Sequence, residues 1–343
     1  SIPVGSQKKS MSENEALELS ESSVMKAVNY RVQADVGVGV FMSGGVDSTL
    51  VAALASRRTN DVQAFTLGFN KSSCLEDEVY EASMSAKKIG ISHRVKLVDP
   101  DEYLSNIFKI SLGYEEPYYS VSPNYMVSSF VKESGVKVAL NGLGGDELFC
   151  GYDYYKWCSL WDRTSLVRPL LRNFKGLNNI SIFNKLSRFS INDPSEFHSN
   201  LFARMSESDL QTLFSTQKIN VQSASSVVKN LYGKRISFED SAEAFSYMDL
   251  RNYVGNHHVE RLDQFTMANS IEGRFPFLDH NVIETAFSIP SKLKLYNNER
   301  KYLLRKVAKK YIASEALAMK KKGFSLPLES WMKSSLSSFV VSN

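Results

Sequence analysis

Four short runs of largely apolar residues, separated by stretches with helical spacing, constrain the fold of this 343-residue chain more than any other feature. Runs of this kind are typical of strands buried on both faces of a parallel sheet. Because they alternate with helices, the pattern predicts an α/β fold, in which helices cover both faces of a twisted parallel sheet. The runs lie at 36–42, 62–69, 93–98 and 136–142.

The spacing of apolar residues predicts the helices and a division of the chain into three parts. We expect a flexible lead-in or linker at 1–12, an α/β domain at 13–153, and a mainly helical lobe at 154–343, because no further strand series follows Tyr154. Helices of the first domain are predicted at 13–32, 49–55, 76–89, 101–111 and 122–132. Helices of the second lobe are predicted at 239–254, 262–271, 281–287 and 301–311.

The composition excludes several classes of protein. An apolar content of 43% with 23% charged residues is ordinary for a globular protein and supplies enough material for a core. The net charge of +4 permits attraction to nucleotides but predicts no nucleic-acid partner. Because no apolar run reaches about 18 residues and no signal peptide opens the chain, we expect no membrane contact. Three irregularly spaced cysteines (Cys74, Cys150 and Cys158) predict free thiols in a reducing cytoplasm.

A glycine turn with the sequence SGGVDS lies between the first predicted strand and the next helix. Gly44 and Gly45 let the backbone approach a ligand closely, since neither carries a Cβ. Amides at the helix start, together with the hydroxyls of Ser43 and Ser48, offer donors to a phosphate at the positive end of the helix dipole. The carboxylate of Asp47 would need a bridging Mg²⁺ to face that phosphate. The competing interpretation is a glycine turn capped by serine and aspartate.

A second glycine-rich segment, at 141–152, follows the fourth predicted strand. Its Asp146 and Glu147 place carboxylates at the same sheet edge as Asp47, the edge beyond which ligands bind in such sheets. Carboxylates from two strand ends are suited to clamp Mg²⁺ and pyrophosphate. The sequence therefore predicts a nucleotide site at this edge.

These motifs resemble one known family. GxxxxGK[ST] is absent, and no GxGxxG follows a strand, so SGGVDS resembles the pyrophosphate loop of the ATP pyrophosphatases, which transfer AMP. The run NGLGGDELFCGY at 141–152 resembles the SGxGxDExFGGY segment of asparagine synthetase. The resemblance extends from about 12 to 332 and implies an adenine nucleotide alpha hydrolase-like sheet, the synthetase part of a glutamine amidotransferase. Further matching segments are LDQFTMA (262–268), EGRFPFLD (272–279), RKYLLR (300–305) and KKGFSLP (321–327).

The resemblance implies roles for the matching residues, with ATP and Mg²⁺ as cofactors. Lys301, Asp47 and Asp146 would be catalytic, and the two aspartates would bind the metal. Lys301 matches a lysine that approaches the α-phosphate, where a positive charge stabilises the negative charge gathering on phosphorus. The competing interpretation of Lys301 is a solvated lysine in the basic stretch at 300–310. The nucleotide would be bound by Met42, Ser43, Gly44, Gly45, Asp47, Ser48, Leu67, Asn141 and Gly142.

Candidates for binding the substrate are Arg274, Asp77 and Glu147. Arg274 suits a bidentate pair with a carboxylate, although a structural salt bridge is an equally good explanation. Asp77 and Glu78 match an acidic pair of the family, and a charge pair at a helix N-terminus is the alternative. We assign none of the five histidines to a metal.

Two departures from the family pattern bear on the reaction. Leu143 stands where asparagine synthetases usually carry a glutamate, so the acyl substrate or the activation of the amine could differ. The family's glutaminase domain begins with a cysteine, and no cysteine precedes Cys74 here. The chain would then take free ammonia or another amine, receive it from a separate subunit, or be a fragment of a longer protein.

The predicted activity is ATP-dependent amide formation. A small-molecule carboxylate, the aspartate side chain in the first instance, would become an acyl-adenylate and pass to ammonia, giving asparagine, AMP and diphosphate. The first alternative is the same chemistry on a sugar acid, or in cyclising a β-lactam or lasso peptide. The second is a non-catalytic nucleotide-binding subunit, and a homodimer stays open.

Overall fold

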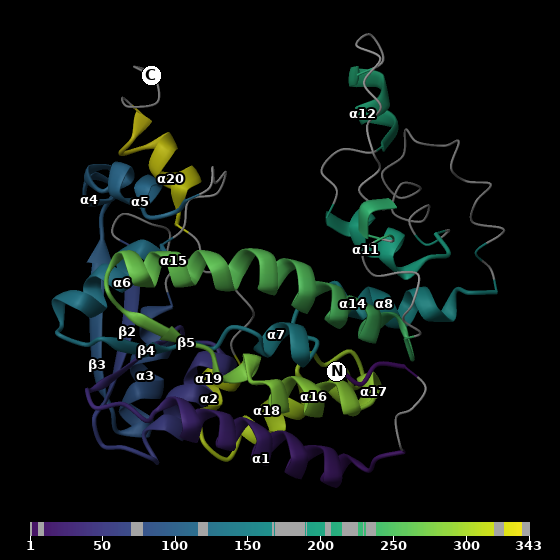
Figure 1. Cartoon of the computed structure of the whole chain (residues 1–343), viewed down its shortest axis with the longest axis horizontal. Coiled ribbons are helices and arrows are strands. Elements are labelled where there is room, and N and C mark those ends of the chain that lie inside the picture. Colours follow the sequence, from purple (N-terminus) through teal and green to yellow (C-terminus); the bar gives the residue numbers. More distant parts are fainter. Residues whose placement is uncertain are drawn as a thin grey trace.

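The structure, a computed structural model, contains a five-stranded parallel sheet toward one end of the molecule and confirms the predicted α/β fold (Figure 1). The strand order is β3-β2-β1-β4-β5. The strands are β1 (Val38–Phe41), β2 (Val62–Phe69), β3 (Ser92–Val98), β4 (Val138–Leu140) and β5 (Glu272–Arg274). The structure describes residues 2–5, 10–69, 78–115, 123–166, 168, 189, 191–202, 207–214, 226–228, 230, 238–318 and 326–337.

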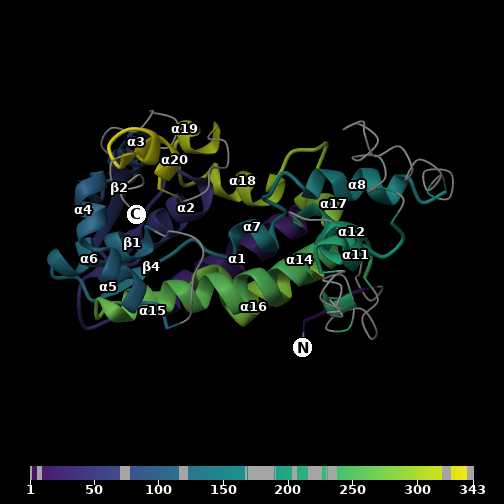
Figure 2. The same ribbon diagram turned by 90° about the horizontal axis from the view of Figure 1, so that it is seen from above.

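Helices cover both faces of this sheet and continue beyond one end of it (Figure 2). Those of the first part are α1 (Glu13–Arg31), α2 (Val46–Ala55), α3 (Val79–Ile89), α4 (Pro100–Ser105), α5 (Ile107–Leu112), α6 (Asn124–Glu133) and α7 (Gly145–Leu148). Those that follow are α8 (Tyr155–Arg163), α11 (Pro194–Phe202), α12 (Glu207–Phe214), α14 (Ser241–Met248), α15 (Glu260–Ala268), α16 (His280–Ser288), α17 (Ser291–Lys294), α18 (Tyr302–Ala308), α19 (Ser314–Ala318) and α20 (Leu328–Lys333). A π-helix, η3 (Asp249–Val259), joins α14 to α15, and a 3-10 turn, η4 (Pro276–Leu278), follows β5.

Alternation along the strands divides the core into two layers. Val40 of β1 packs with α1, α2, α16 and α18 on one face. Phe65 of β2 packs on the other face, with α6, α15 and α20. A third apolar cluster, around Phe197 and Phe245, forms the core of the helical end that holds α8, α11 and α14. Successive residues of a strand point to opposite faces, so both layers need strands that are apolar throughout.

One strand follows Tyr154, in the part of the chain predicted to be mainly helical without a further strand series. β5 pairs in parallel with β4, with Leu140 opposite Arg274, and completes one edge of the sheet. Three residues of sequence EGR are too short and too polar to show a strand pattern. Both α16 and α18 contact α1, so the second part of the chain packs closely on the first.

Other predicted boundaries shift by a few residues or divide. The predicted helix at 49–55 begins at Val46, which places Asp47 and Ser48 in its first turn. The predicted helix at 101–111 is two short helices, α4 and α5, separated at Asn106. The start of the predicted helix at 76–89 lies outside the described residues, and α3 begins at Val79.

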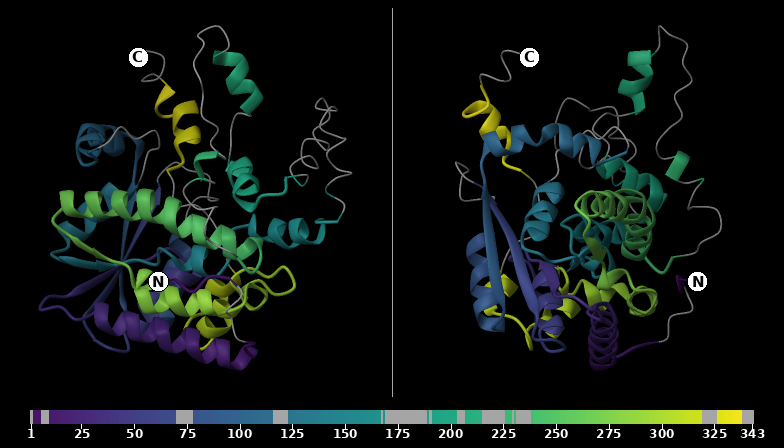
Figure 3. Two further views of the ribbon diagram at one scale, coloured as in Figure 1. Left: turned by 45° about the vertical axis from the view of Figure 1, so that its right-hand side comes forward. Right: turned by 60° about the vertical axis from the view of Figure 1, so that its left-hand side comes forward.

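The helices α14, η3 and α15 form one long rod on the opposite side of the sheet from α1 (Figure 3). The rod links the helical end of the molecule to the sheet, because α14 contacts α8 and α11 while α15 contacts α6 and β5. None of the helices that the structure describes combines the length and apolar character required to cross a bilayer.

Within the predicted lead-in or linker, Gly5 contacts the helical part of the chain. The Gly5 amide donates to both carboxylate oxygens of the buried Glu243, at 3.2 and 3.1 Å. Ser12 then begins α1 with a capping box, in which its side chain accepts from the Glu15 amide while the Glu15 carboxylate accepts from the Ser12 amide. The lead-in therefore packs against the rest of the structure at Gly5, and Ser12 is part of the start of α1.

Candidate active site

The turn at 43–48 connects the end of β1 to the start of α2. The Ser48 hydroxyl donates to the Ser43 carbonyl at 2.9 Å and accepts from the Ser43 amide at 3.1 Å. Gly45 is the N-cap residue of α2, and no side chain at this position accepts a hydrogen bond from the amides of the first turn. The amides of the first turn of α2 therefore point toward the space beyond β1, where they can bind an anion.

The turn at 145–151, which follows β4, packs directly against the turn at 43–48. A Cβ on Gly142 would lie 2.7 Å from the Ser48 amide nitrogen. A Cβ on Gly145 would lie 2.6 Å from the Asp47 carboxyl carbon. No side chain fits at such distances, so these glycines are required for the two turns to meet.

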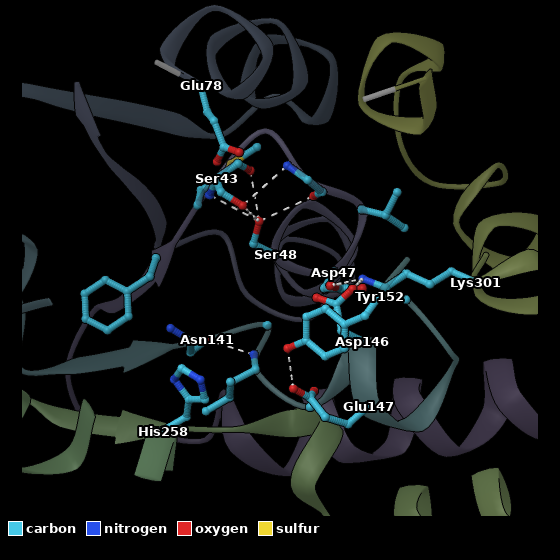
Figure 4. Close-up of a pocket in the computed structure, with 18 of the residues that line it drawn as sticks. Ser43, Asp47, Ser48, Glu78, Asn141, Asp146, Glu147, Tyr152, His258 and Lys301 are labelled. Carbon is cyan, nitrogen blue, oxygen red and sulfur yellow. Dashed lines mark hydrogen bonds and ion pairs between the residues drawn. The ribbon is translucent and has the colours of Figure 1, made fainter. Parts of the chain in front are cut away.

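Lys301 joins the two turns through its ammonium group. Its Nζ makes ion pairs with Asp47 Oδ2 and, at 2.6 Å, with Asp146 Oδ1 (Figure 4). Lys301 is 8% exposed and adopts a left-handed backbone conformation (φ 53°) immediately before α18. A Cβ on Gly151 would clash with both Asp146 Oδ1 and Lys301 Cε. The structure thus brings together three residues that lie far apart in the sequence, around one charged centre.

These turns form one wall of a cavity of about 530 Å³ at the carboxyl ends of β1 and β4. The residues predicted to bind nucleotide line it, except Gly44, which lies within the turn but does not line the cavity. Asp77 lies outside the described residues, whereas its neighbour Glu78 lines the cavity. The predicted residues that line it are Met42, Ser43, Gly45, Asp47, Ser48, Leu67, Asn141, Gly142, Asp146, Glu147 and Lys301.

Arg274 is the last residue of β5 and lies outside the cavity lining. Its Nη1 donates to the carbonyls of Arg31 and Gln33, both at 2.8 Å, and its Nε donates to Glu272 Oε1 at 2.9 Å. These bonds fasten β5 to the end of α1, and Arg274 does not line the cavity. The structure therefore favours the structural explanation of Arg274 over binding of a substrate.

Glu147 is buried next to Asp146, beside the charged centre that Lys301 forms with Asp47 and Asp146. Burial, together with repulsion from Asp146, raises the pKa of the Glu147 carboxyl to about 7. The Tyr152 hydroxyl donates to Glu147 Oε1 at 2.6 Å and acts in the opposite direction. Burial also raises the pKa of Tyr152 well above its ordinary value, so Tyr152 stays a donor.

The carboxylates of Asp47 and Asp146 fit a magnesium ion. Both contact Lys301 Nζ and so lie close together, which leaves their other oxygens to face a metal beside the ammonium, and hard oxygen ligands are those that Mg²⁺ prefers. The described residues contain no group of three or more metal-binding side chains. Phosphate oxygens and water would therefore complete the coordination, which is usual for magnesium at phosphate sites.

The sequence did not point to the opposite wall, which comes from η3 and α15. Tyr253, His258 and Arg261 line the cavity there. Arg261 Nη2 lies 2.7 Å from His258 Nδ1, so the ring nitrogen accepts a hydrogen bond from the guanidinium. A π-helix has a wider turn than an α-helix, and ordinary helical spacing could not have predicted which of its side chains face the cavity.

The parallel sheet, the glycine turn after β1 and the carboxylates that follow β1 and β4 define an α/β protein with a candidate nucleotide site at the carboxyl edge of its sheet. The sequence model described as asparagine synthase matches residues 20–342, and the chain belongs to this family.

Relatives support the same assignment. The glutamine-hydrolysing asparagine synthetase 1 of Bacillus subtilis (strain 168) is 29% identical over 93% of this chain and 51% of its own length. A provisionally named glutamine-hydrolysing asparagine synthetase of Mycobacterium tuberculosis (strain H37Rv) is 31% identical over 91% of this chain and 48% of its own length. Amidase chry2 of Gibberella zeae is 25% identical over 93% of this chain and 54% of its own length. The chain spans about half the length of the curated relatives it matches.

Proposed function

We propose that this chain is an ATP-dependent, AMP-forming carbon–nitrogen ligase. It adenylates a carboxylate, in the first instance the side chain of aspartate, and passes the acyl group to ammonia. The products are asparagine, AMP and diphosphate. The observation that carries the proposal is the contact of Lys301 with both Asp47 and Asp146 beside the turn at 43–48.

In the first step, a carboxylate oxygen of the substrate attacks the α-phosphorus of ATP, and the bond to the bridging oxygen of the diphosphate breaks. The amides and hydroxyls of the turn at 43–48 bind the departing diphosphate. The Lys301 ammonium offsets the negative charge that gathers on the α-phosphoryl oxygens. Because that ammonium is held by two carboxylates and little exposed, it needs little reorganisation as the charge develops.

Mg²⁺ bound by Asp47 and Asp146 would supply positive charge to the phosphates of ATP. In the second step, ammonia attacks the acyl carbon, the bond to the AMP oxygen breaks, and a proton leaves the nitrogen. Met42, Leu67, Asn141 and Gly142 would bind the adenosine, since all four line the cavity. Glu147, also at the cavity, is a candidate for contacting the acceptor.

The same chemistry on a different carboxylate is the second candidate function. Leu143 lines the cavity where the family usually carries a glutamate, and leucine can neither accept a hydrogen bond nor bind a cation. A sugar acid or a cyclising substrate would fit this candidate, and a relative named as an amidase is in keeping with other substrates. A nucleotide-binding subunit without activity has less support, because it would not need the Lys301 centre.

The source of ammonia and the setting of the reaction are also proposals. The named asparagine synthetase relatives hydrolyse glutamine and are about twice as long as this chain. A glutaminase domain or subunit would therefore supply the ammonia, and the reaction would take place in the cytoplasm. Neither a nucleic acid nor a membrane is needed for it.

A pyrophosphate-release screen tests the proposal. The protein is mixed with ATP, Mg²⁺, ammonia and one of a panel of carboxylic acids, including aspartate, and the Asp146→Asn variant serves as the control. We expect release of pyrophosphate and formation of AMP with aspartate. Release with a sugar acid but not with aspartate would favour the second candidate, and no release with any acid would contradict ligase activity.

A further inference from the structure

A buried polar network lies behind the 145–151 turn, on the side away from the cavity. Its centre is the carboxylate of Asp249, which is 1% exposed at the junction of α14 and η3. Asp249 Oδ2 accepts from the Tyr154 hydroxyl at 2.6 Å and from the Tyr155 hydroxyl at 2.7 Å. Asp249 Oδ1 lies 2.7 Å from His198 Nε2 of α11. The carboxylate thus ties together α8, α11 and the long rod.

The network reaches the turn through a single backbone carbonyl. The Glu147 carbonyl accepts from the Ser246 hydroxyl at 2.7 Å, and the Tyr155 hydroxyl lies 3.3 Å from it. The carbonyls of Gly145 and Asp146 accept from amides of the same turn, whereas the Glu147 carbonyl accepts from other helices. Ser246 makes the shorter of its two bonds, and the Tyr155 hydroxyl, whose one proton is shared with Asp249, makes the longer one.

Tyr154 and Tyr155 share one acceptor and differ in their contact with the 145–151 turn. Both hydroxyls donate to the same oxygen of Asp249, and their rings stack at 4.9 Å. The Tyr155 hydroxyl alone of the two also faces the Glu147 carbonyl. Burial and the neighbouring Asp249 raise the pKa of both phenols far above the ordinary value, so both stay neutral donors.

We propose that Tyr155, oriented by Asp249, is a positioning residue that fixes the backbone of the 145–151 turn and so aims the Asp146 carboxylate at Lys301 and the metal. This inference rests on the proposed function, because it assumes that Asp146 binds Mg²⁺. The contacts form a chain from Asp249 to the Tyr155 hydroxyl, to the Glu147 carbonyl, and through one peptide to Asp146. Loss of a partner that orients a metal ligand typically weakens metal binding by about 10- to 100-fold.

The test compares Tyr155→Phe with Tyr154→Phe. Each variant keeps its ring and loses one donor to the same carboxylate oxygen, so we expect similar losses of melting temperature. The probe is the preformed complex of Mg²⁺ with inorganic pyrophosphate, titrated into the protein by calorimetry without turnover. We expect Tyr155→Phe to weaken its binding about tenfold and Tyr154→Phe to leave it unchanged. Equal affinities for the two variants would overturn the proposal.

Hydrogen exchange provides a second readout that a merely structural role would not separate. The Gly151 amide donates to the Asp146 carbonyl at 2.7 Å within the turn. We expect faster exchange of this amide in Tyr155→Phe than in Tyr154→Phe. If Tyr155→Phe does not fold, Ser246→Ala removes the other donor to the Glu147 carbonyl and should change binding and exchange in the same direction. If Ser246→Ala then shows the same binding of Mg²⁺–pyrophosphate and the same exchange of the Gly151 amide as the unaltered protein, the proposal is contradicted.

Asp146→Asn separates failure of this inference from failure of the proposed function. If Asp146→Asn binds Mg²⁺–pyrophosphate as tightly as the unaltered protein, Asp146 is not a metal ligand, and both the proposed metal role and this inference fail. If Asp146→Asn binds weakly while the two tyrosine variants behave alike, only the positioning role fails.

Discussion

The two turns that bring Asp47 and Asp146 together are built in opposite ways. The turn at 43–48 is held by bonds between neighbours, since Ser43 and Ser48 are five residues apart. The turn at 145–151 depends on distant partners, because Ser246 lies 99 residues from the carbonyl that it holds. A turn held by neighbouring residues is specified by one short motif. A turn held by residues far away in the sequence is specified by the fold of the whole helical lobe. The comparison predicts that damage to the lobe weakens the second turn and leaves the first intact.

Loss of Lys301 should have the largest effect, because both turns meet at its ammonium. We expect Lys301→Met to lower the rate of pyrophosphate release roughly a thousandfold, or about 4 kcal/mol of barrier, since a preorganised charge at the reacting phosphorus is removed. The measurement is steady-state kinetics with saturating ATP. Lys306→Met is the matched control on the same helix, because Lys306 pairs with Glu13 at the surface and should cost less than about twofold. Comparable losses in both variants would contradict a special role for Lys301.

Adding one carbon to the second turn should have the next largest effect. A Cβ on Gly151 would clash with Asp146 and Lys301, so Gly151→Ala must displace one of them. We expect about a hundredfold loss of rate, since small misplacements of catalytic groups have effects of this size. In Gly90→Ala the new Cβ meets no atom within 4 Å and the residue has φ +82°, so we expect a stability cost of about 1 kcal/mol and an unchanged rate. An active Gly151→Ala enzyme would show that the turns are not packed as tightly as described.

A change inside the first turn should have a smaller effect. Ser48→Ala removes a hydroxyl that bonds to the Ser43 backbone, and we expect about tenfold weaker binding of ATP from the loss of one or two hydrogen bonds. Ser56→Ala, at the other end of α2, removes a hydroxyl that bonds only within the helix in the described structure and should leave ATP binding unchanged. Equal affinities of Ser48→Ala and Ser56→Ala for ATP would contradict the role assigned to the hydrogen bonds within the turn at 43–48.

The smallest expected effect concerns pH and the contact between His93 of β3 and Thr66 of β2. His93 Nε2 lies 2.8 Å from the Thr66 hydroxyl, which donates to the Met42 carbonyl at 2.6 Å. Burial lowers the pKa of His93 below its ordinary value of 6.5. The unfolded chain therefore takes up a proton before the folded one does, and His93 contributes stability above pH 6.5 that is lost as the pH falls from 6.5 through the lowered value.

Urea unfolding of the unaltered protein and of His93→Gln, each at pH 8 and at pH 5.5, measures this contribution. The unaltered protein should lose more stability between the two pH values than the variant does. The same loss in both would assign the pH dependence to other groups.

The local parts of the structure could be predicted from the sequence, and the distant parts could not. SGGVDS is one continuous motif, so its place between β1 and α2 followed from its neighbours. β5 has only three residues, two of them charged; it pairs with β4, and Arg274 also fastens it to the end of α1. Nothing near Arg274 in the sequence distinguishes that role from binding a carboxylate.

The candidate site likewise has parts that could be predicted from the sequence and parts that could not. The strand ends predict that Asp47 and Asp146 share one sheet edge, and the resemblance adds Lys301, but their meeting depends on glycines whose reason appears only in three dimensions. The wall made by η3 and α15 was missed, because a π-helix changes which side chains share a face. The link from Asp249 through Tyr155 to Glu147 spans about a hundred residues, and no local pattern could have indicated it.

Transfer of an oxygen isotope tests the central claim most directly. Aspartate labelled with ¹⁸O in its side-chain carboxylate is incubated with the protein, ATP, Mg²⁺ and ammonia, and the products are analysed by mass spectrometry. If Lys301 and the two carboxylates direct attack on the α-phosphorus, one ¹⁸O atom should appear in AMP and none in inorganic phosphate. Label in inorganic phosphate, together with ADP, would mean attack on the γ-phosphorus and would contradict the account.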